Sequence, residues 1–364
     1  MDEIRADDLG PLKVLHFHFP RTDFRAVLVI DNTSLGPAIG GLRITPSVTT
    51  EEVMRLARAM TLKNSAAGLH HGGGKAGIVA SPGNPQIERF IRLFARQIRD
   101  LTDYIPGPDM GSNEQSMAWV YDEIERAVGL PEEMGGLPLD KLGATGFGLA
   151  ECAEVACPYA GLQLKGARVV IQGFGSVGKA AAKFLAAKGA VIVAASDTKG
   201  TVYNRGGLDV EELIETKESS KSVTHFKEGT VLGIQDIFSL DTDILVPAAS
   251  ADVINEGNVD GIRAKLILQG ANIPATKAAE EALHGKGVLC VPDFIANAGG
   301  VIMGAMEYGR KVEREAFEAI STRIKANTRL VLEKSTGEKL PPRQAAIEFA
   351  GERVRQAMKY RDTL

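Results

Sequence analysis

The chain has 364 residues, a formal net charge of −4 at pH 7, a hydrophobic fraction of 44% and an aromatic fraction of 5%. This length favours two domains, and the slight excess of acidic residues argues against nucleic acid or an anionic membrane surface as the partner. The first residues lack the apolar core of a signal peptide, and no stretch approaches the ~18 apolar residues of a membrane-spanning helix. We therefore expect a soluble, cytoplasmic protein.

The first informative helix is expected to begin after Thr49. Thr49 and Glu52 have the spacing of a capping box, in which each side chain bonds the backbone of the other. The apolar positions that follow are Val53, Leu56 and Met60. One further step of three reaches Lys63. A lysine, whose charged amine is costly to bury, therefore continues the apolar face. The pattern indicates either an amine that binds an anionic group or a lysine that extends from the helix end toward water.

A second lysine, Lys75, follows three consecutive glycines, Gly72 to Gly74. Glycine is used where the backbone bends unusually or lies close to a ligand. The apolar run 76–80 predicts a buried strand directly afterwards. We therefore expect the glycines to form a loop that presents Lys75 to a substrate, rather than a plain flexible turn.

An acidic partner is expected at Asp109, since Pro106 and Pro108 stiffen the chain before it. Ser112 is predicted to cap the helix that follows. Asp109 then lies just before a helix N-terminus, where the helix dipole favours a carboxylate by roughly 0.3–1 kcal/mol. With the capping role taken by Ser112, Asp109 is left for proton transfer.

A change of domain is expected near Gly135, Gly136 and Pro138. We place a substrate, catalytic and oligomerisation domain at 1–134 and a second domain at 135–329, with the chain returning to the first domain over 330–364. Helical spacing is found over 313–333 and 342–360. Cys152, Cys157 and Cys290 lack the spacing of a metal site or of a disulfide framework, and we expect them to be buried small hydrophobes.

The second domain contains the pattern of a dinucleotide-binding turn. A strand over 165–172 is followed by Gly173, Phe174, Gly175, Ser176, Val177 and Gly178, and then by a helix that extends to Ala187. A second strand over 190–195 leads to Asp197, at about the twenty-residue distance of the acid that binds the adenosine ribose. Such an acid repels a 2′-phosphate, so NAD is predicted as the cofactor in preference to NADP. Lys199 lies near enough to weaken that preference.

Further strands are predicted over 244–247, 266–268 and 288–291, alternating with helical stretches. This alternation is typical of a doubly wound parallel sheet, whose ligands bind at the carboxyl ends of the strands. Ala248, Asn272 and Asn297 follow these strands and are predicted to contact cofactor or substrate, although each asparagine could instead be a turn residue. The predicted fold is thus α/β, with an N-terminal catalytic domain and a Rossmann NAD-binding domain.

Six motifs in one order extend over nearly the whole chain: Gly36-Pro37-Ala38-Ile39-Gly40-Gly41, Met60-Thr61-Leu62-Lys63, Gly72-Gly73-Gly74-Lys75, Pro108-Asp109-Met110-Gly111, Gly173 to Gly178, and Pro292-Asp293-Phe294 with Asn297-Ala298-Gly299-Gly300. Together they resemble the glutamate/leucine/phenylalanine/valine dehydrogenases. That family interconverts an L-amino acid with its 2-oxo acid and ammonia, using NAD or NADP, and forms oligomers through its first domain. The resemblance therefore implies small-molecule partners and a homo-oligomer.

The resemblance also implies roles for single residues. Lys63 would hold the substrate α-carboxylate, Lys75 would activate water or polarise the carbonyl, and Asp109 would carry the proton of the amine. Thr145 matches a threonine that contacts the nicotinamide carboxamide. No metal is implied.

Substrate choice is where the chain departs from the glutamate enzymes, which carry a lysine at Ile39 and a serine at Gly304 to bind the side-chain carboxylate. Without these groups a second carboxylate would be desolvated without compensation. Ile39, Gly40, Asn297 and Gly304 are therefore predicted to contact an apolar amino acid of the leucine, valine or phenylalanine type. The alternatives are a glutamate dehydrogenase, an oxidoreductase of hydroxy acids, and a non-catalytic NAD-binding regulatory subunit.

Overall fold

The computed structural model describes residues 6–361, which divide into two compact units. Unit 1 contains the chain up to Leu139, Val301–Phe317, and the segment from Ile347 onward. Unit 2 contains Asp140–Gly300 and Glu318–Ala346. The division differs from the predicted one in three places: the first boundary follows Leu139 rather than residue 134, 301–317 belongs to unit 1, and the final return to unit 1 begins at residue 347 rather than 330.

The described part of unit 1 is built on a five-stranded sheet with the order β1-β2-β4-β3-β5. Its strands are β1 (Lys13–His18), β2 (Arg25–Asn32), β3 (Ala38–Thr45), β4 (Gly72–Val79) and β5 (Tyr104–Pro108). Strand β3 runs parallel to both of its neighbours, β4 and β5, whereas β2 is antiparallel to β1 and β4. The carboxyl ends of β3, β4 and β5 therefore point the same way.

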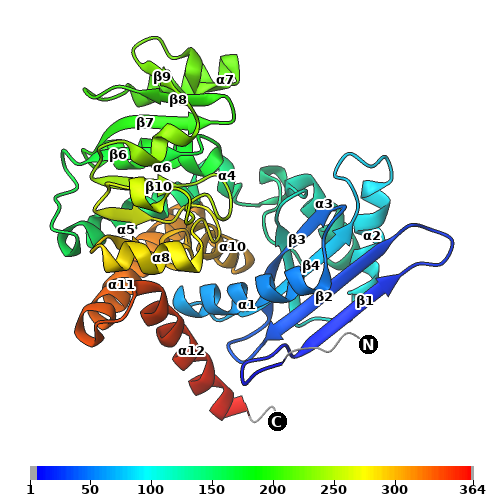
Figure 1. Ribbon diagram of the computed structural model, residues 1–364. Helices are drawn as coiled ribbons and strands as arrows, with labels where there is room; N and C mark the ends of the chain where they lie inside the picture. Colours follow the sequence, from blue (N-terminus) through cyan, green and yellow to red (C-terminus); the bar gives the residue numbers. More distant parts are fainter. Residues whose placement is uncertain (1–5, 362–364) are drawn as a thin grey trace. The chain divides into compact units, whose positions relative to one another are not determined.

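Helices cover both faces of this sheet: α1 (Thr50–Ala66), visible beside the sheet in Figure 1, on one side, and α2 (Ile87–Gln97) with α3 (Glu114–Ile124) on the other. The side chains of β2 alternate between the two cores on either side of the sheet. Leu28 and Ile30 belong to the core that contains Phe90 and Phe94 of α2, while Val27 and Val29 pack in the core of α1. Successive side chains of a strand point to opposite faces, so a sheet buried on both sides needs an uninterrupted apolar strand.

The three glycines before Lys75 are the first residues of strand β4, so the expectation of a loop was wrong. Their backbone lies too close to its neighbours for side chains. A Cβ on Gly72 would lie 1.8 Å from the carbonyl oxygen of Asn32, and one on Gly73 would lie 2.0 Å from the backbone nitrogen of Thr61. The glycines therefore allow α1 and the adjoining strands to approach β4 closely.

This close approach also corrects the predicted face of α1. Its fully buried residues include Val53, Ala57, Thr61 and Asn64, whereas Leu56, Met60 and Lys63 are only half-buried. Small side chains at 57 and 61 fit against the glycines of β4, and larger apolar ones do not. Steric fit at the strand, rather than hydrophobic spacing alone, decides which face is buried.

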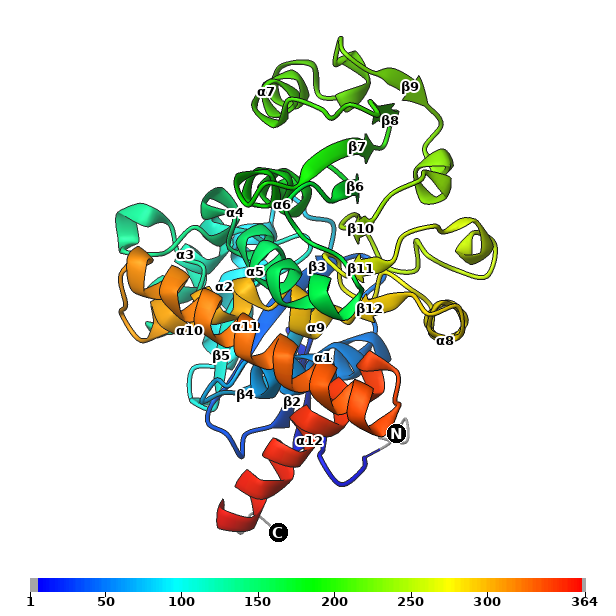
Figure 2. The ribbon, with the colours of Figure 1, turned by 90° about the vertical axis from the view of Figure 1, so that its left-hand side faces the viewer.

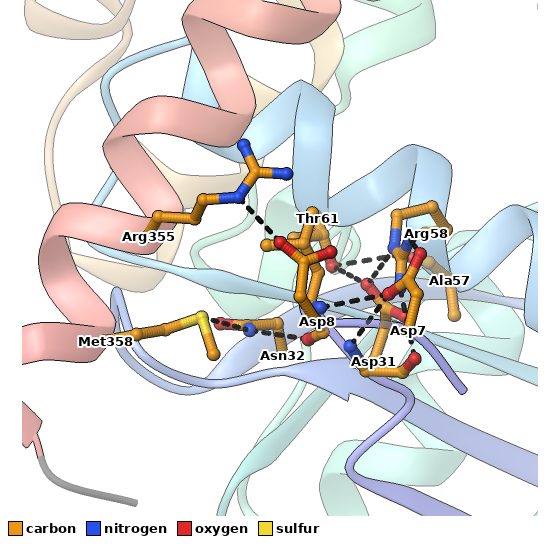
Figure 3. Close-up of polar contacts among 11 residues, drawn as sticks. Asp7, Asp8, Asp31, Asn32, Ala57, Arg58, Thr61, Arg355 and Met358 are labelled. Carbon is orange, nitrogen blue, oxygen red and sulfur yellow. Dashed lines mark hydrogen bonds and ion pairs between the residues drawn. The ribbon is translucent and has the colours of Figure 1, made fainter.

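The beginning of the described chain is tied to α1 by an ion-pair network, shown in Figure 3. Arg58 donates from Nε to Asp31 at 2.9 Å and from its two terminal nitrogens to Asp7 at 2.6 and 2.7 Å. The Thr61 hydroxyl also donates to Asp31, at 2.6 Å. Asp31 is only 2% exposed, so these donors replace the hydrogen bonds to water that burial removes.

Replacing Arg58 by methionine is expected to lower the free energy of unfolding by about 3 kcal/mol, because a buried carboxylate loses its cation. Chemical denaturation followed by tryptophan fluorescence measures this change. Arg355→Met is the matched control, since Arg355 pairs with Asp8 at an exposed position and its loss should cost under about 1 kcal/mol. Equal effects of the two substitutions would contradict the role given to Arg58.

Unit 2 contains a seven-stranded sheet in its described residues, with the order β12-β11-β10-β6-β7-β8-β9. The strands are β6 (Arg168–Gln172), β7 (Val191–Asp197), β8 (Gly200–Tyr203), β9 (Thr230–Leu232), β10 (Ile244–Pro247), β11 (Leu266–Leu268) and β12 (Leu289–Val291). Figure 2 shows β7, β6, β10, β11 and β12 following one another. These five are parallel, and β8 and β9 add an antiparallel edge that the sequence reasoning missed.

The helices from residue 139 onward are α4 (Leu139–Leu142), α5 (Ala144–Tyr159), α6 (Ser176–Ala187), α7 (Val210–Ser220), α8 (Lys277–Gly285), α9 (Asp293–Ala296), α10 (Gly299–Tyr308), α11 (Glu313–Glu338) and α12 (Pro342–Arg361). The predicted return of the last helix is confirmed within unit 1. Ser65 of α1 donates its hydroxyl proton to the carbonyl of Ala350 at 2.7 Å, and Arg353 donates to the carbonyl of Ser65 at 2.5 Å. The predicted two-domain α/β fold is thus confirmed.

The three cysteine thiols are free and buried. Burial raises the pKa of Cys152 to about 12 and that of Cys157 to about 11, so both thiols stay protonated near neutral pH. Among residues 6–361, no helix is long and apolar enough to cross a membrane.

Candidate functional site

Unit 1 brings together Lys75, within strand β4, and Asp109, directly after strand β5. Strand β3 lies between β4 and β5, and its residue Leu42 pairs with both Ala76 and Pro108. Lys75 directly precedes Ala76, and Asp109 directly follows Pro108. The Nζ atom of Lys75 and the Oδ2 atom of Asp109 lie 3.1 Å apart. Lys75 is 5% exposed. A buried amine in contact with a carboxylate can exchange protons with a bound substrate.

Arg43 is a second cation on Asp109, and the sequence reasoning missed it. Its Nε donates to the same Oδ2 at 2.8 Å, and its terminal nitrogen donates to Glu52 Oε1 at 2.5 Å. Glu52 was expected to complete a capping box. Instead Thr49 caps α1 by accepting from the Glu52 backbone, and the Glu52 side chain is turned to Arg43. The signal that could have found Arg43 is a charged residue inside an otherwise apolar strand.

Burial and neighbouring charges shift both pKa values. Burial lowers the pKa of Lys75 below the usual lysine value, although the charge of Asp109 opposes that shift. Burial raises the pKa of Asp109, but Lys75 and Arg43 outweigh it, so the pKa of this carboxyl lies below its usual range. Asp109 is therefore ionised near neutral pH, and Lys75 loses its proton more easily than an ordinary lysine.

The turn after β5 holds Asp109 in place through Ser112. The Ser112 hydroxyl accepts from the backbone nitrogen of Asp109 at 2.9 Å and donates to the carbonyl of Leu42 at 2.7 Å. The cap of α3 is Asn113, which forms a capping box with Ser116. The expectation that Ser112 caps this helix was wrong, and Ser112 belongs to the support of Asp109 instead.

One glycine of β3 makes room for this pair, and its neighbour packs against the next strand. A Cβ on Gly41 would lie 2.6 Å from Asp109 Cβ and 3.1 Å from Lys75 Nζ, so only glycine leaves the two side chains where they are. Gly40, predicted to contact substrate, packs on the Gly74 carbonyl oxygen, 1.7 Å from an ideal Cβ. Its own carbonyl accepts from the buried Tyr104 hydroxyl at 2.8 Å. The described contacts of Gly40 therefore fix the strands behind the site.

Lys63 lies half-buried near the end of α1. Its neighbour Asn64 is fully buried and donates to the carbonyl of Gly72 at 2.6 Å, which joins α1 to the start of β4. The side-chain oxygen of Asn64 is buried without a hydrogen-bond partner among the described residues. Asn64 therefore connects the helix that carries Lys63 to the strand that carries Lys75.

The residues predicted to select the substrate side chain gather around Val128. Ile39, Ile105 and Val128 form a buried apolar cluster against which Ala305 packs, and Ile39 is 4% exposed. An ideal Cβ on Gly304 would lie 3.6 Å from Val128 Cγ2, which places Gly304 at the same cluster. The structure thus brings Ile39 and Gly304 to one apolar group of residues.

Glu307 supports the segment that follows Val128 and was not predicted. It lies one turn after Gly304 in α10 and accepts from the backbone nitrogens of Leu130 and Leu137, both at 3.0 Å. Burial raises the pKa of Glu307 above its usual value. Its oxygens are engaged by backbone donors, so Glu307 holds the segment that follows Val128.

In unit 2 the predicted glycine turn joins β6 to α6 and fits a dinucleotide. Gly173 has a φ of +94°, and a Cβ on Gly178 would lie 2.0 Å from the Gly173 carbonyl oxygen. A Cβ on Gly175 would meet nothing within 4 Å among the described residues, so the backbone is open where a pyrophosphate is expected to approach. Gly175 is the N-cap of α6, and Ser176 and Val177 open the helix, while Phe174 is buried. The amides at a helix N-terminus bind phosphate oxygens.

Asp197 ends β7, next to the glycine turn. The Gly173 and Phe174 backbone nitrogens donate to the carbonyl of Ser196, at 3.1 and 2.8 Å. The carboxylate of Asp197 is engaged within the protein, since Lys217 Nζ contacts its Oδ2 at 2.6 Å. Burial raises the pKa of Asp197, but Lys217 and two backbone donors outweigh it and hold that pKa below its usual range.

The remaining predicted contacts gather at the carboxyl ends of β10, β11 and β12. Asn297 donates from Nδ2 to the carbonyls of Gly270 and Ala271 at 3.2 Å and to Asn272 Oδ1 at 3.3 Å. Its Oδ1 is buried with no hydrogen-bond partner within residues 6–361. Thr145, in the first turn of α5, and Ala248, directly after β10, are half-buried. The Asn297 oxygen is an acceptor that a ligand amide could use.

Two family models match the chain. The model described as "Glutamate/Leucine/Phenylalanine/Valine dehydrogenase" matches residues 135–362, and "Glu/Leu/Phe/Val dehydrogenase, dimerisation domain" matches residues 11–126. Glutamate dehydrogenase of Aeropyrum pernix is 41% identical over 355 residues, covering 91% of this chain and 85% of the relative. The NADP-specific glutamate dehydrogenase of Saccharolobus shibatae is 37% identical, covering 92% of this chain and 84% of that relative. The NAD-specific glutamate dehydrogenase of Staphylococcus aureus is 35% identical, covering 96% and 91%.

Solved structures agree with this assignment. The Leu-bound hetero-hexameric glutamate dehydrogenase of Thermus thermophilus has a TM-score of 0.87 at 30% identity, covering 96% of this chain and 90% of that one. L-Tryptophan dehydrogenase of Nostoc punctiforme has a TM-score of 0.74 at 27% identity, covering 96% and 97%. The chain therefore belongs to the glutamate/leucine/phenylalanine/valine dehydrogenase family and is an oxidoreductase that acts on amino acids.

Proposed function

We propose that this chain catalyses the reversible oxidative deamination of an L-amino acid with an apolar side chain to its 2-oxo acid and ammonia. The observation that carries the substrate choice is the apolar cluster of Ile39, Ile105 and Val128, with Gly304 beside it. A carboxylate placed there would lose hydration without gaining a cation. Leucine, valine and phenylalanine are the side chains that suit such a surface.

Glutamate is the second candidate, and the names of the relatives favour it over an apolar substrate. The three relatives compared above are glutamate dehydrogenases, although the tryptophan dehydrogenase shows that the same fold also occurs with an aromatic substrate. A glutamate enzyme would need a cation for the second carboxylate from a position other than 39.

The proton chemistry is assigned to Lys75 and Asp109. When bound, NAD or NADP supplies the acceptor for the hydride that leaves the substrate Cα. Lys63 holds the α-carboxylate, and neutral Lys75 takes a proton from the water that replaces the amine. Because both cations contact Asp109 through Oδ2, we assign Oδ1 as the atom that takes the proton of the substrate amine and returns it to the leaving ammonia.

For the cofactor side, Gly173 to Gly178 would hold the pyrophosphate, and Thr145, Ala248, Asn272 and Asn297 would contact the nicotinamide end. The acid Asp197 supports NAD as a cofactor. NAD-specific and NADP-specific relatives both exist, so family membership leaves the preference open. An oligomer is supported by the matched dimerisation domain and by the hetero-hexameric relative, and we propose that this chain forms a homo-oligomer.

The decisive experiment is the rate of NAD reduction at alkaline pH with leucine, valine, phenylalanine, tryptophan and glutamate, repeated with NADP. We expect kcat/KM to be highest for an apolar amino acid. Activity on glutamate alone would contradict the substrate choice but leave the roles of Lys75 and Asp109 in place. No turnover of any amino acid would favour a non-catalytic NAD-binding subunit.

Arg43→Gln and Glu52→Gln are expected to shift the pH dependence of deamination in opposite directions. Activity rises as Lys75 loses its proton, so the rising limb of kcat/KM follows the pKa of this amine. Burial is the main cause of its low value, the Arg43 charge lowers it further, and the Glu52 charge raises it. The limb should therefore move to higher pH in Arg43→Gln and to lower pH in Glu52→Gln. Shifts in the same direction would show that the two residues do not act through the charge of Lys75.

A further inference from the structure

The carboxylate of Asp197 is already surrounded by donors from unit 2. Its Oδ1 accepts from the Lys199 backbone nitrogen at 2.8 Å and from the Ser222 hydroxyl at 3.3 Å. Its Oδ2 accepts from Lys217 Nζ at 2.6 Å and from the Val223 backbone nitrogen at 2.8 Å. The Asp197 side chain is only 5% exposed. An acid held in this way presents much less negative charge than an unpaired one.

The other charged side chains near this ion pair do not restore a negative field. Glu218, next to Lys217 on α7, pairs with Lys179 of α6 at 2.7 Å. Lys199 and Lys221 are exposed, and neither forms an ion pair with a residue in the described range. Among the charged residues named here, the two that have no ion-pair partner in the described range, Lys199 and Lys221, are both cations.

This balance matters because Asp197 follows Ser196, whose carbonyl is bonded by the glycine turn. In this fold, the residue at the end of that strand faces the adenosine ribose, and its charge decides whether a 2′-phosphate is tolerated. A free carboxylate rejects the phosphate, and a carboxylate neutralised by a lysine does not.

We propose that Lys217 sets the cofactor specificity of this chain by neutralising Asp197, so that the enzyme accepts NADP as well as NAD. This proposal rests on the proposed dinucleotide-binding function of unit 2. It assigns to Lys217 a role that no motif in the sequence indicates. It also names the chemical feature that is recognised, a monoester phosphate on the 2′-oxygen of the adenosine ribose.

The test is direct binding of ADP-ribose and of 2′-phospho-ADP-ribose to the full chain, measured by isothermal titration calorimetry at low ionic strength. Neither probe carries nicotinamide, so the result does not depend on turnover. The ratio of the two affinities isolates the contribution of the 2′-phosphate. In the unsubstituted chain we expect the two dissociation constants to agree within about tenfold.

Three variants change the local charge in known steps. Lys217→Met leaves Asp197 unpaired and should weaken 2′-phospho-ADP-ribose relative to ADP-ribose by about tenfold. Asp197→Asn leaves Lys217 unpaired and should strengthen the binding of 2′-phospho-ADP-ribose relative to that of ADP-ribose by a similar factor. The double variant removes both charges and should return the ratio to near that of the unsubstituted chain, even if one single variant folds poorly.

Lys286→Met is the matched control. Lys286 forms an ion pair with Asp260 at 2.6 Å and follows α8, which packs on β12 at the opposite edge of the same sheet. Its removal changes the net charge by the same amount and should leave the ratio unaltered. An equal shift in Lys286→Met would overturn the local role of Lys217, as would an unaltered ratio in Lys217→Met.

The outcomes also separate this proposal from the function on which it rests. ADP-ribose binding with a strong rejection of 2′-phospho-ADP-ribose would overturn the role of Lys217 and leave unit 2 as a dinucleotide-binding unit. Failure to bind either probe would overturn the dinucleotide function itself.

Discussion

Lys75→Ala is expected to lower kcat for deamination by about 10²- to 10⁴-fold, the range typical of a lost acid–base group. Lys75 is the buried amine that contacts Asp109 at 3.1 Å, and burial lowers its pKa. Its removal leaves water without a positioned base. The dinucleotide turn lies in unit 2, so ADP-ribose binding should be retained, and steady-state kinetics with calorimetry would measure both properties.

Two further variants separate proton transfer from charge and from surface effects. Lys75→Arg keeps a cation that cannot lose its proton, so it should be about as slow as Lys75→Ala. Lys311→Ala is the control, because Lys311 forms an exposed ion pair with Glu315 in the same unit and should retain normal turnover. Turnover of Lys75→Ala within tenfold of the unsubstituted enzyme would contradict the assignment of Lys75 as the base.

The double substitution Ile39→Lys with Gly304→Ser is expected to raise the ratio of kcat/KM for glutamate over leucine by about 100-fold. It introduces a cation and a hydroxyl at the apolar cluster formed with Ile105 and Val128. A side chain fits at 304, because an ideal Cβ there makes ordinary contact with Val128 at 3.6 Å. The value of kcat/KM for glutamate should rise because the new cation binds the side-chain carboxylate. The value for leucine should fall because the surface is less apolar.

Ile39→Met with Gly304→Ser is the matched control, since it changes shape and adds the hydroxyl without the charge. This variant should keep its preference for an apolar amino acid. If the double substitution to lysine and serine leaves the ratio unaltered, the substrate side chain is bound elsewhere, and the apolar cluster is only part of the core.

The residues proposed for the site stand out in the sequence because they occur in recognisable motifs. Lys75 follows glycines that only a close backbone approach explains, and Asp109 follows a proline-stiffened strand. The glycine turn after β6 has its strand, helix and second strand in order along the chain. Each of these features depends on one continuous stretch of chain of at most about thirty residues, which a sequence displays directly.

The missed features depend on contacts between distant residues. The burial of α1 is decided by the glycines of β4, so apolar spacing predicts Leu56 and Met60 where Ala57 and Thr61 are buried. Lys217 reaches Asp197 from helix α7, twenty positions further along the chain, so the sequence alone does not show that the acid at the end of β7 is paired. Steric fit and ion pairing of this kind arise only with tertiary structure.

The chain of contacts from Glu52 through Arg43 and Asp109 to Lys75 alternates in charge and is electrically neutral while Lys75 is protonated. When Lys75 loses its proton, the same four groups carry a charge of −1 and attract the α-ammonium of an amino acid. If the amino acid binds at this site as proposed, its binding and proton release from Lys75 are thermodynamically linked, whereas a 2-oxo acid, which lacks the ammonium, is expected to bind best to the neutral set. Ambient pH is therefore expected to change which of the two substrates the enzyme binds more tightly, while the direction of net reaction is set by the concentrations of substrates and products.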